Sequence, residues 1–407
     1  MLGCLGRRSI FLSALVFGAF AVAADWPQWR GPNRNGTSSE TGLLESWPQG
    51  GPRLIWKGQG VGEGYSSFAV IGGRLYTQGQ DGDQEFVIAI DTKTGKQAWK
   101  TPSGGAFRES RGPGPRGTPT VDGARLYALA ADGTLVCLDT ASGKRVWGKN
   151  IVTDFRGGVP RWGISESPLV DGDKVIVTPG GSGAAVVALD KNTGDAVWRS
   201  QSDSAGYSSP VLFEAAGSRN VVVFTGEGAV GLDMKDGSLH WRYTKASNRT
   251  ANIATPIIHK GHVFLSSDYG TGAALLRLTP EGGRIKASEV YFSREMRNHY
   301  STSVLVGDYL YGFSSSILTA MKFMTGEVAW RDRSVGKGSV TYADRHLYVL
   351  GENGTIALVE ATPEGYKEKS RFEIPRGDYP TWTPPVVADG RLYLREQDNV
   401  YAYSVKR

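Results

Sequence analysis

Short apolar runs recur along the whole chain, each flanked by Gly, Ser, Thr or Asp. In each repeat a Ser/Thr-rich start leads into an apolar run, a Gly turn and a second run of Leu-Tyr type, as in GTPTVDGARLYALA and TPPVVADGRLYLRE. A third run such as GTLVCLD follows, and a polar turn then leads to an aromatic residue. Short apolar runs bounded by turn residues predict β-strands, and the order predicts four strands in each unit.

The polar turn is the clearest sign of repetition. DTKTGKQAW (91–99) returns as DTASGKRVW (139–147), DKNTGDAVW (190–198) and DMKDGSLHW (233–241). Tryptophans at 56, 99, 147, 198 and 241 are followed by one at 330, about two steps later, so one unit lacks its Trp. Val290 and Tyr291 lie near the expected place in that unit, and Phe372 continues the series. Four-stranded units of this period are typical of β-propeller blades.

Counting fourth strands gives eight units. The last unit ends after three strands, whereas the strand around Trp56 has no blade before it. We therefore expect an all-β, single eight-bladed β-propeller of four-stranded antiparallel blades, closed by an N-terminal strand that completes the last blade. The propeller would occupy residues 51–407, and residues 25–50 would be an extension packed on it. Trp26, Trp29 and Trp47 of this extension either pack across the ring or cover a groove.

Residues 1–24 predict a cleavable export signal. Arg7 and Arg8 precede an apolar run that ends in a small-residue stretch, with cleavage expected near Ala23 or Ala24. A retained membrane anchor would need about 20 apolar residues, more than this run offers. The location expected is periplasmic or secreted, without a lipid anchor because Cys4 precedes the arginines. Cys137 would then stay alone as a buried, inert thiol.

Composition excludes several classes of partner and chemistry. The net charge of +6 is mild, and no Lys/Arg run resembles a nucleic-acid patch. No later segment approaches transmembrane length, and no phosphate loop, zinc spacing or GxSxG elbow is present. We expect a monomer without nucleic-acid partners.

Candidate site residues lie in the loops between blades, on the face opposite to the polar turns. These loops are rich in arginine and aromatic residues: Arg108, Arg111, Arg116, Arg156, Arg161, Arg249, Arg294 and Arg297, with Trp162, Tyr207, Tyr300 and Trp382. Guanidinium groups suit carboxylates and phosphates, and aromatic faces suit planar rings or sugars. The loops could therefore bind an acidic or planar ligand or an acidic peptide loop. Alternatively, the arginines pair with carboxylates nearby and staple the blades: Glu109, Asp154, Glu166, Asp203 and Asp378.

Two further residues have alternative interpretations. Glu166, at the start of an inner strand, could serve as a metal ligand or a base, or form an ion pair with Arg161 or Arg116. His299 could act as an acid or base, or be only a polar loop residue.

The motif Asp-x-x-Thr-Gly-Lys-x-x-Trp, after strands ending in AI, CL or AL, resembles the repeat of pyrroloquinoline-quinone-like propellers over about residues 50–407. That repeat is shared by quinoprotein alcohol dehydrogenases, polyvinyl-alcohol dehydrogenase included, and by BamB, an eight-bladed scaffold without cofactor. This chain departs from both groups, because it has no adjacent Cys pair, no Cys-x-x-Cys-His and no lipid-bearing Cys.

The resemblance implies two functions. One is an exported, non-catalytic scaffold of the cell envelope that needs no cofactor and binds a protein or acidic ligand through the Arg/aromatic loops. The other is a pyrroloquinoline-quinone-dependent alcohol dehydrogenase. In the second, arginines would meet the quinone's carboxylates, Trp162 or Trp382 would stack on its rings, and Glu166 and Asn252 would hold Ca²⁺.

Overall fold

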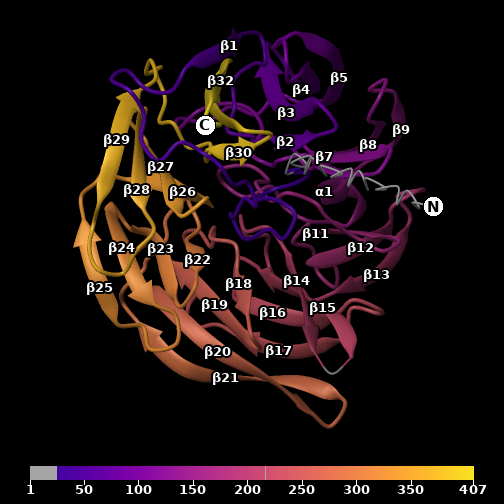
Figure 1. The fold of residues 1–407 in the computed structure, drawn as a ribbon. Helices are drawn as coiled ribbons and strands as arrows, with labels where there is room; N and C mark the ends of the chain where they lie inside the picture. The colour runs from indigo at the N-terminus through magenta and orange to yellow at the C-terminus, as the bar shows by residue number, and fades with distance from the viewer. Residues whose placement is uncertain (1–24, 216) are drawn as a thin grey trace, which may run out of the picture.

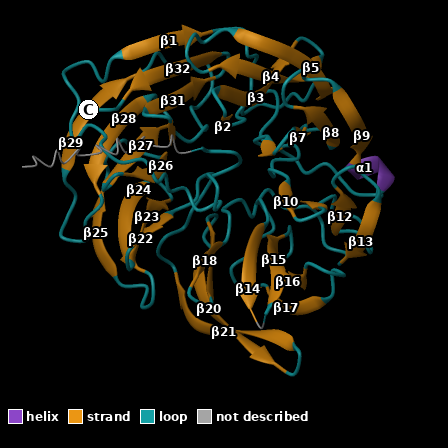
Figure 2. Cartoon of the chain, turned by 45° about the vertical axis from the view of Figure 1, so that its right-hand side comes forward, coloured by secondary structure: helices purple, strands orange, loops and turns teal. Residues whose placement is uncertain are grey.

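Strands dominate this chain and are arranged as a ring (Figure 2). A computed structural model describes residues 25–215 and 217–407, and the predicted export signal lies outside these residues. Within them, 32 strands form eight four-stranded antiparallel sheets, the blades I to VIII. In seven blades all four strands are consecutive in the chain, and the fourth strand lies at the outer edge (Figures 1 and 2).

The strands of the first four blades are, for blade I, β2 (Ala69–Ile71), β3 (Arg74–Asp81), β4 (Gln84–Asp91) and β5 (Gln97–Gly105); for blade II, β6 (Thr120–Asp122), β7 (Arg125–Leu129), β8 (Thr134–Asp139) and β9 (Arg145–Asn150); for blade III, β10 (Leu169–Asp171), β11 (Lys174–Val177), β12 (Val186–Asp190) and β13 (Ala196–Ser200); and for blade IV, β14 (Val211–Ala215), β15 (Ser218–Phe224), β16 (Ala229–Asp233) and β17 (Leu239–Tyr243). One short helix, α1 (Ile151–Asp154), follows β9, and the side chain of Asn150 caps it.

The strands of the other blades are, for blade V, β18 (Ile257–His259), β19 (His262–Ser267), β20 (Gly272–Glu281) and β21 (Arg284–Ser293); for blade VI, β22 (Val304–Val306), β23 (Tyr309–Ser314), β24 (Ile317–Lys322) and β25 (Val328–Asp332); for blade VII, β26 (Gly338–Ala343), β27 (His346–Gly351), β28 (Thr355–Glu360) and β29 (Glu368–Glu373); and for blade VIII, β30 (Val386–Ala388), β31 (Arg391–Glu396), β32 (Asn399–Ser404) and β1 (Leu54–Gly58).

Blade VIII joins the two ends of the propeller. The strand order in its sheet is β1-β32-β31-β30, with β1 antiparallel to β32. The predicted eight-bladed ring, closed by an N-terminal strand, is therefore confirmed. Closure pairs β1 with β32, so neither of these terminal strands is left without a partner.

The repeated polar turn and Trp form one contact between adjacent blades. Trp99 of blade I donates from Nε1 to the backbone oxygen of Thr140 in the turn of blade II, at 3.1 Å. Its ring lies against Gly143 of the same turn, where an added Cβ would come within 2.6 Å of the ring. Gly143 has φ +70°, which glycine adopts without strain. The Trp-to-Gly contact recurs from Trp56 to Gly95, and this explains why the repeat requires both residue types.

Blade V departs from the repeat. Tyr291, and not the exposed Val290, occupies the Trp position there and donates to the backbone oxygen of Phe323 at 2.9 Å. Blade V itself has the long β20–β21 hairpin, which projects from the ring in Figure 1, in place of the repeated polar turn. Trp241 of blade IV consequently has no acceptor for its buried Nε1. Tyr243 and Lys245 bond to Glu289 of β21 across this junction.

Residues 26–47, called here the N-terminal segment, run through the middle of the ring (indigo in Figure 1). The segment bonds to the first strands, or to residues just before them, of six blades: Trp26 to Val70, Pro27 to Val121, Arg34 to Ser167 and Pro168, Trp29 to Thr255, Arg30 to Thr302 and Ser303, and Ser38 to Tyr342. Arg30 and Arg34 are buried and donate mainly to backbone oxygens. Trp47 packs between Tyr348 and Phe372 of blade VII.

Two further features concern the envelope and redox chemistry. Among the described residues, none of the helices is long and apolar enough to cross a membrane. Cys137 is free and buried in β8, and burial raises the pKa of its thiol to about 11.

Candidate functional site

A pocket opens at the centre of the loop face, the face that carries the loops between blades. Its volume is about 560 Å³, within the range of small-molecule sites. Each blade contributes one residue at an equivalent position, four residues before the first strand in seven of the blades and one residue before the longer β26 in the other. These eight ring positions are Tyr65, Arg116, Ser165, Tyr207, Ile253, Tyr300, Lys337 and Trp382.

The inner end of the pocket meets the N-terminal segment. Trp29 lines the pocket there and donates from Nε1 to Thr255 Oγ1 at 2.9 Å. Thr255 lies two residues beyond the ring position Ile253, deeper along the same chain, and Ser209 and Pro384 occupy the corresponding places in their blades. The segment therefore makes the pocket open to the loop face and closed toward the middle of the ring.

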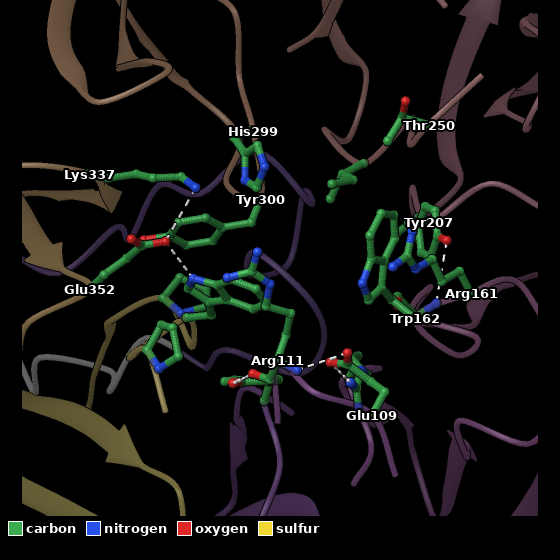
Figure 3. Close-up of a pocket in the computed structure, with 18 of the residues that line it drawn as sticks. Glu109, Arg111, Arg161, Trp162, Tyr207, Thr250, His299, Tyr300, Lys337 and Glu352 are labelled. Carbon is green, nitrogen blue, oxygen red and sulfur yellow. Dashed lines mark hydrogen bonds and ion pairs between the residues drawn. The ribbon is translucent and has the colours of Figure 1, made fainter. Parts of the chain in front are cut away.

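Aromatic rings form a continuous belt around half of the pocket. Tyr65 packs on Trp382 at 5.0 Å between ring centroids, and Trp382 stacks on Tyr300 at 5.4 Å. The belt continues from Tyr300 to His299 at 6.1 Å and on to Tyr269 at 5.1 Å. Figure 3 shows Trp162 and Tyr207 on the opposite side, a second aromatic pair at 5.6 Å. Facing aromatic walls of this kind offer broad apolar surfaces to a ring-shaped ligand.

The charged groups of the lining fall into two classes. Arg116 pairs with Glu109 at 3.0 Å, and Lys337 pairs with Glu352 at 3.4 Å. Arg111 and Arg161 are exposed at the mouth and have no carboxylate partner among the described residues. Arg161 stacks on Trp162 at 5.2 Å, and both arginines are among the lining residues labelled in Figure 3. Two guanidinium groups are thus available to an anion.

Two polar atoms of the lining are enclosed without a partner, the hydroxyl of Tyr300 and Nδ1 of His299. Burial raises the pKa of Tyr300 well above its usual value, so its hydroxyl keeps its proton. Burial, with Lys337 and Arg111 nearby, lowers the pKa of His299, which is therefore neutral at pH 7. Enclosed polar atoms without partners are uncommon in folded proteins, and here both belong to residues that line the pocket.

Some of the predicted site residues meet in this pocket. The lining includes eight of the fifteen candidate site residues: Arg111, Arg116, Arg161, Trp162, Tyr207, His299, Tyr300 and Trp382. The Arg116–Glu109 pair lies within the loop between β5 and β6, so this arginine is paired with a carboxylate but does not staple two blades. Arg242 of β17 pairs with Asp203 of the loop that follows β13, a staple of the kind considered as an alternative.

Seven candidates do not line the pocket: Arg108, Arg156, Glu166, Arg249, Asn252, Arg294 and Arg297. Arg108 pairs with Asp83 at the surface, and Arg156 is exposed after α1. Arg297 bonds through its backbone to Ser314.

The expectation of an ion pair between Glu166 and Arg161 or Arg116 is wrong. Glu166 is buried, and its Oε1 accepts a hydrogen bond from the backbone N–H of Thr178 at 2.6 Å. Burial raises the pKa of Glu166 to about 7, although the Thr178 bond and nearby Arg34 oppose this shift. The cation near Glu166 comes from the N-terminal segment, which the sequence pattern did not place there.

The proposed calcium ligands do not fit a metal site. The amide of Asn252 donates to Thr225 O at 2.9 Å and accepts from Asn248 N at 3.0 Å, so both its ends are engaged in loop structure. Glu166 is likewise engaged, and neither side chain faces the pocket. In the part of the chain that the structure describes, no three His, Cys, Asp or Glu side chains gather as metal ligands.

Sequence reasoning missed several lining residues, among them Tyr65, Tyr269, Lys337 and Glu352. A signal for Tyr65 was present, because Gly-Tyr-Ser-Ser precedes the first strand both at Tyr65 and at Tyr207. Aligning every blade on its first strand would have identified all eight ring positions.

Comparisons with known proteins agree with this fold. The BamB of Moranella endobia (strain PCIT) is 22% identical over 262 residues, which cover 60% of this chain and 64% of that protein. The quinohemoprotein alcohol dehydrogenase of Comamonas testosteroni is 33% identical over 121 residues, covering 28% of this chain and 16% of that enzyme. The chain thus matches less than two thirds of the length of either relative.

Solved structures show the same ring. BamB from Moraxella catarrhalis superposes with a TM-score of 0.64 at 17% identity, covering 87% of this chain and 98% of that one. The quinohemoprotein alcohol dehydrogenase of Comamonas testosteroni superposes with a TM-score of 0.66 at 14% identity, covering 94% of this chain and 81% of that one. These likenesses establish the fold alone. Residues 45–154 and 87–332, together more than half of the chain, match the family model described as outer membrane protein assembly factor BamB, and the chain therefore belongs to this family of pyrroloquinoline-quinone-like β-propellers.

Proposed function

We propose that this chain is an exported, non-catalytic β-propeller of the cell envelope that binds an anionic partner through its loop face. The observation that carries the proposal is the pair Arg111 and Arg161, which lies without carboxylate partners at the mouth of an aromatic-walled pocket. Guanidinium groups left free at a concave site favour carboxylates and phosphates by charge-assisted hydrogen bonds.

The distribution of charge supports a binding role over stapling. Arg116 and Lys337 each have a carboxylate neighbour within the pocket, whereas Arg111 and Arg161 have none among the described residues. Four cationic side chains therefore face two carboxylates in the lining. This excess favours a ligand that carries negative charge.

The quinone-dependent alternative requires a metal-ligand set. Glu166 and Asn252 are engaged with the backbone and do not face the pocket, so no step of a dehydrogenase reaction is derived from them. Pyrroloquinoline quinone with Ca²⁺, added to the purified protein, is expected to produce no dye reduction with an alcohol. Stoichiometric binding followed by such reduction would overturn the non-catalytic assignment.

Export is part of the proposal. Residues 1–24 would be removed, residues 25–50 would stay as the extension that fills the ring, and residues 51–407 would form the propeller. N-terminal sequencing of the protein recovered from the envelope checks this, and an uncleaved Met1 would contradict it.

The partner proposal is tested by charge reversal. Affinity capture from a solubilised envelope fraction compares the wild type with the double variant Arg111→Glu and Arg161→Glu. The wild type is expected to retain proteins or glycans that the variant loses, and higher salt should reduce this capture.

The matched control is Lys93→Glu with Lys96→Glu, which makes the same change of charge at an exposed polar turn on the opposite face. This control is expected to capture as the wild type does. An identical captured set in all three samples would contradict a role for the loop face.

A further inference from the structure

We propose that the pocket binds an acidic sugar, a pyranose ring that carries a carboxylate, at the end of a glycan chain. This inference rests on the proposed function, because it names the chemical class of the ligand at the same face. Three independent features of the lining support it: the shape of the aromatic walls, the mixture of polar groups, and the free guanidinium pair.

The walls suit a saturated ring. A pyranose presents an apolar C–H face on each side, and such faces pack on aromatic rings. Tyr65, Trp382 and Tyr300 form one connected wall, and Trp162 with Tyr207 forms the other. A pyranose ring packed on either wall would occupy the pocket without entering the blades.

The polar groups between the walls suit hydroxyls, which donate and accept hydrogen bonds at once. Glu109 and Glu352 offer acceptors, although each already lies beside a cation. Ser110, Ser165 and Thr250 add hydroxyl groups to the lining. A flat aromatic polyacid has acceptors but few donors, so it would leave these carboxylates without new partners.

The two enclosed polar atoms of the lining also favour a sugar. The Tyr300 hydroxyl and His299 Nδ1 have no partner, and they adjoin each other through their rings at 6.1 Å. Sugar hydroxyls can satisfy a donor and an acceptor at adjacent positions, and doing so removes the cost of leaving them unpaired.

The free guanidinium groups favour a sugar that carries a negative charge. Arg111 and Arg161 lie at the mouth, so they would meet a carboxylate at the rim while the ring packs inside. Planar guanidinium groups match the planar carboxylate with paired hydrogen bonds. Because Trp29 closes the inner end, the pocket accepts the terminal unit of a glycan and not an internal one.

The experiment is a titration of the full mature chain with trigalacturonate, followed by tryptophan fluorescence and calorimetry. Trp29, Trp162 and Trp382 line the pocket, so binding is expected to change the emission. The methyl ester of the same trisaccharide lacks the charge and is expected to bind at least about tenfold more weakly, as for the loss of a charged hydrogen bond.

Two variants locate the binding. Arg111→Gln removes one free cation and is expected to weaken trigalacturonate binding about tenfold, with a small effect on the methyl ester. Tyr300→Phe keeps the ring that stacks on Trp382 but removes the hydroxyl, and it is expected to weaken both ligands about fivefold. Lys93→Gln, on the opposite face, is the control for charge and is expected to bind as the wild type.

The outcomes separate this inference from the proposed function. Binding of an oligoglutamate peptide or a benzene dicarboxylate, but not of trigalacturonate, would overturn the sugar and leave an anion-binding face. Trigalacturonate binding unchanged in both variants would place the sugar elsewhere and overturn the inference. Failure of every anionic probe, together with unchanged capture by the Arg111→Glu, Arg161→Glu protein, would overturn both.

Discussion

Glu85 and Glu166 are carboxyl groups that the fold buries without a paired cation in contact. Glu85 accepts from the backbone N–H of Ala131 at 3.0 Å through one oxygen, and its other oxygen has no partner. Burial is the largest cause that raises the pKa of Glu85 to about 8, and the pKa of Glu166 to about 7, from 4.5. Both groups therefore hold a proton in the folded chain at pH 6, where the unfolded chain has lost it.

This difference gives the protein a pH-dependent stability. The pKa of Glu85 is higher in the folded chain than in the unfolded chain. Its contribution to the free energy of unfolding is therefore complete below pH 4.5 and is lost as the pH rises through about 8. Glu85→Gln has no carboxyl group at this position, so the variant does not lose this contribution as the pH rises. The free energy of unfolding of the variant, relative to that of the wild type, is expected to increase by at least about 1 kcal/mol from pH 5 to pH 8.

Urea unfolding at both pH values measures the effect. The exposed Glu63→Gln serves as the control and is expected to follow the wild type. A difference between Glu85→Gln and wild type that stays constant with pH would contradict the role of burial.

At the scale of the blade, the stabilising element is the contact between a Trp and the Gly turn of the next blade. Trp99 covers Gly143 and bonds to Thr140, so blades I and II share both a ring contact and a hydrogen bond. The same arrangement explains why the turn carries its glycine at positive φ and why an Asp begins it. Asp139 accepts from the backbone N–H of Ser142 and holds the turn in shape.

Gly143→Ala tests this contact. An alanine Cβ would lie 2.6 Å from the Trp99 ring, so the ring must move, whereas Gly123 in the same blade has a positive φ and open space around it. Both substitutions carry the backbone cost of about 1–3 kcal/mol, and Gly143→Ala is expected to lose at least about 1 kcal/mol more. Urea unfolding compares the two, and equal losses would show that the ring contact does not stabilise the blades.

The repeat made the blade predictable because one contact imposes the same residues at the same spacing in most blades. Blade V shows the limit, because its long hairpin replaces the repeated polar turn and leaves Trp241 without an acceptor. The location of Glu166 was unpredictable for another reason. Its charged neighbour, Arg34, lies 132 residues earlier in the sequence and reaches it only through the middle of the ring.

The candidate site was partly predictable. The loops that hold Arg111, Arg161 and Trp382 could be assigned to one face from strand order alone. Which side chains turn toward the axis depends on the ring positions, and those become visible only when the blades are aligned. Tyr65 was therefore missed, although its Gly-Tyr-Ser-Ser sequence repeats at Tyr207.

At the scale of the whole molecule, the N-terminal segment is the central structural element. Arg30 donates to the backbone oxygens of Thr302 and Ser303 at 3.0 and 2.6 Å, and Arg34 donates to Ser167 and Pro168 on the other side. One short stretch of chain thus ties blades III and VI, which are not neighbours in the ring, together across the axis.

Arg30→Met is expected to lower the free energy of unfolding by roughly 3 kcal/mol or more, because each buried acceptor left unpaired costs about 1–3 kcal/mol. Thermal unfolding followed by circular dichroism measures the loss. Arg53→Met, at an exposed position beside β1, is the control and is expected to change little. An equal melting temperature for both variants would mean that the N-terminal segment adds nothing to the ring.

The position of this segment also sets an order in time. Synthesis delivers residues 26–47 before any blade exists, yet their partners arrive as late as Tyr342 and Val405. The later part of this segment must therefore wait for its partners until the last blades have emerged. A nascent chain of seven blades has neither a partner for β1 nor a finished axis, so the molecule cannot complete folding stepwise as it is made.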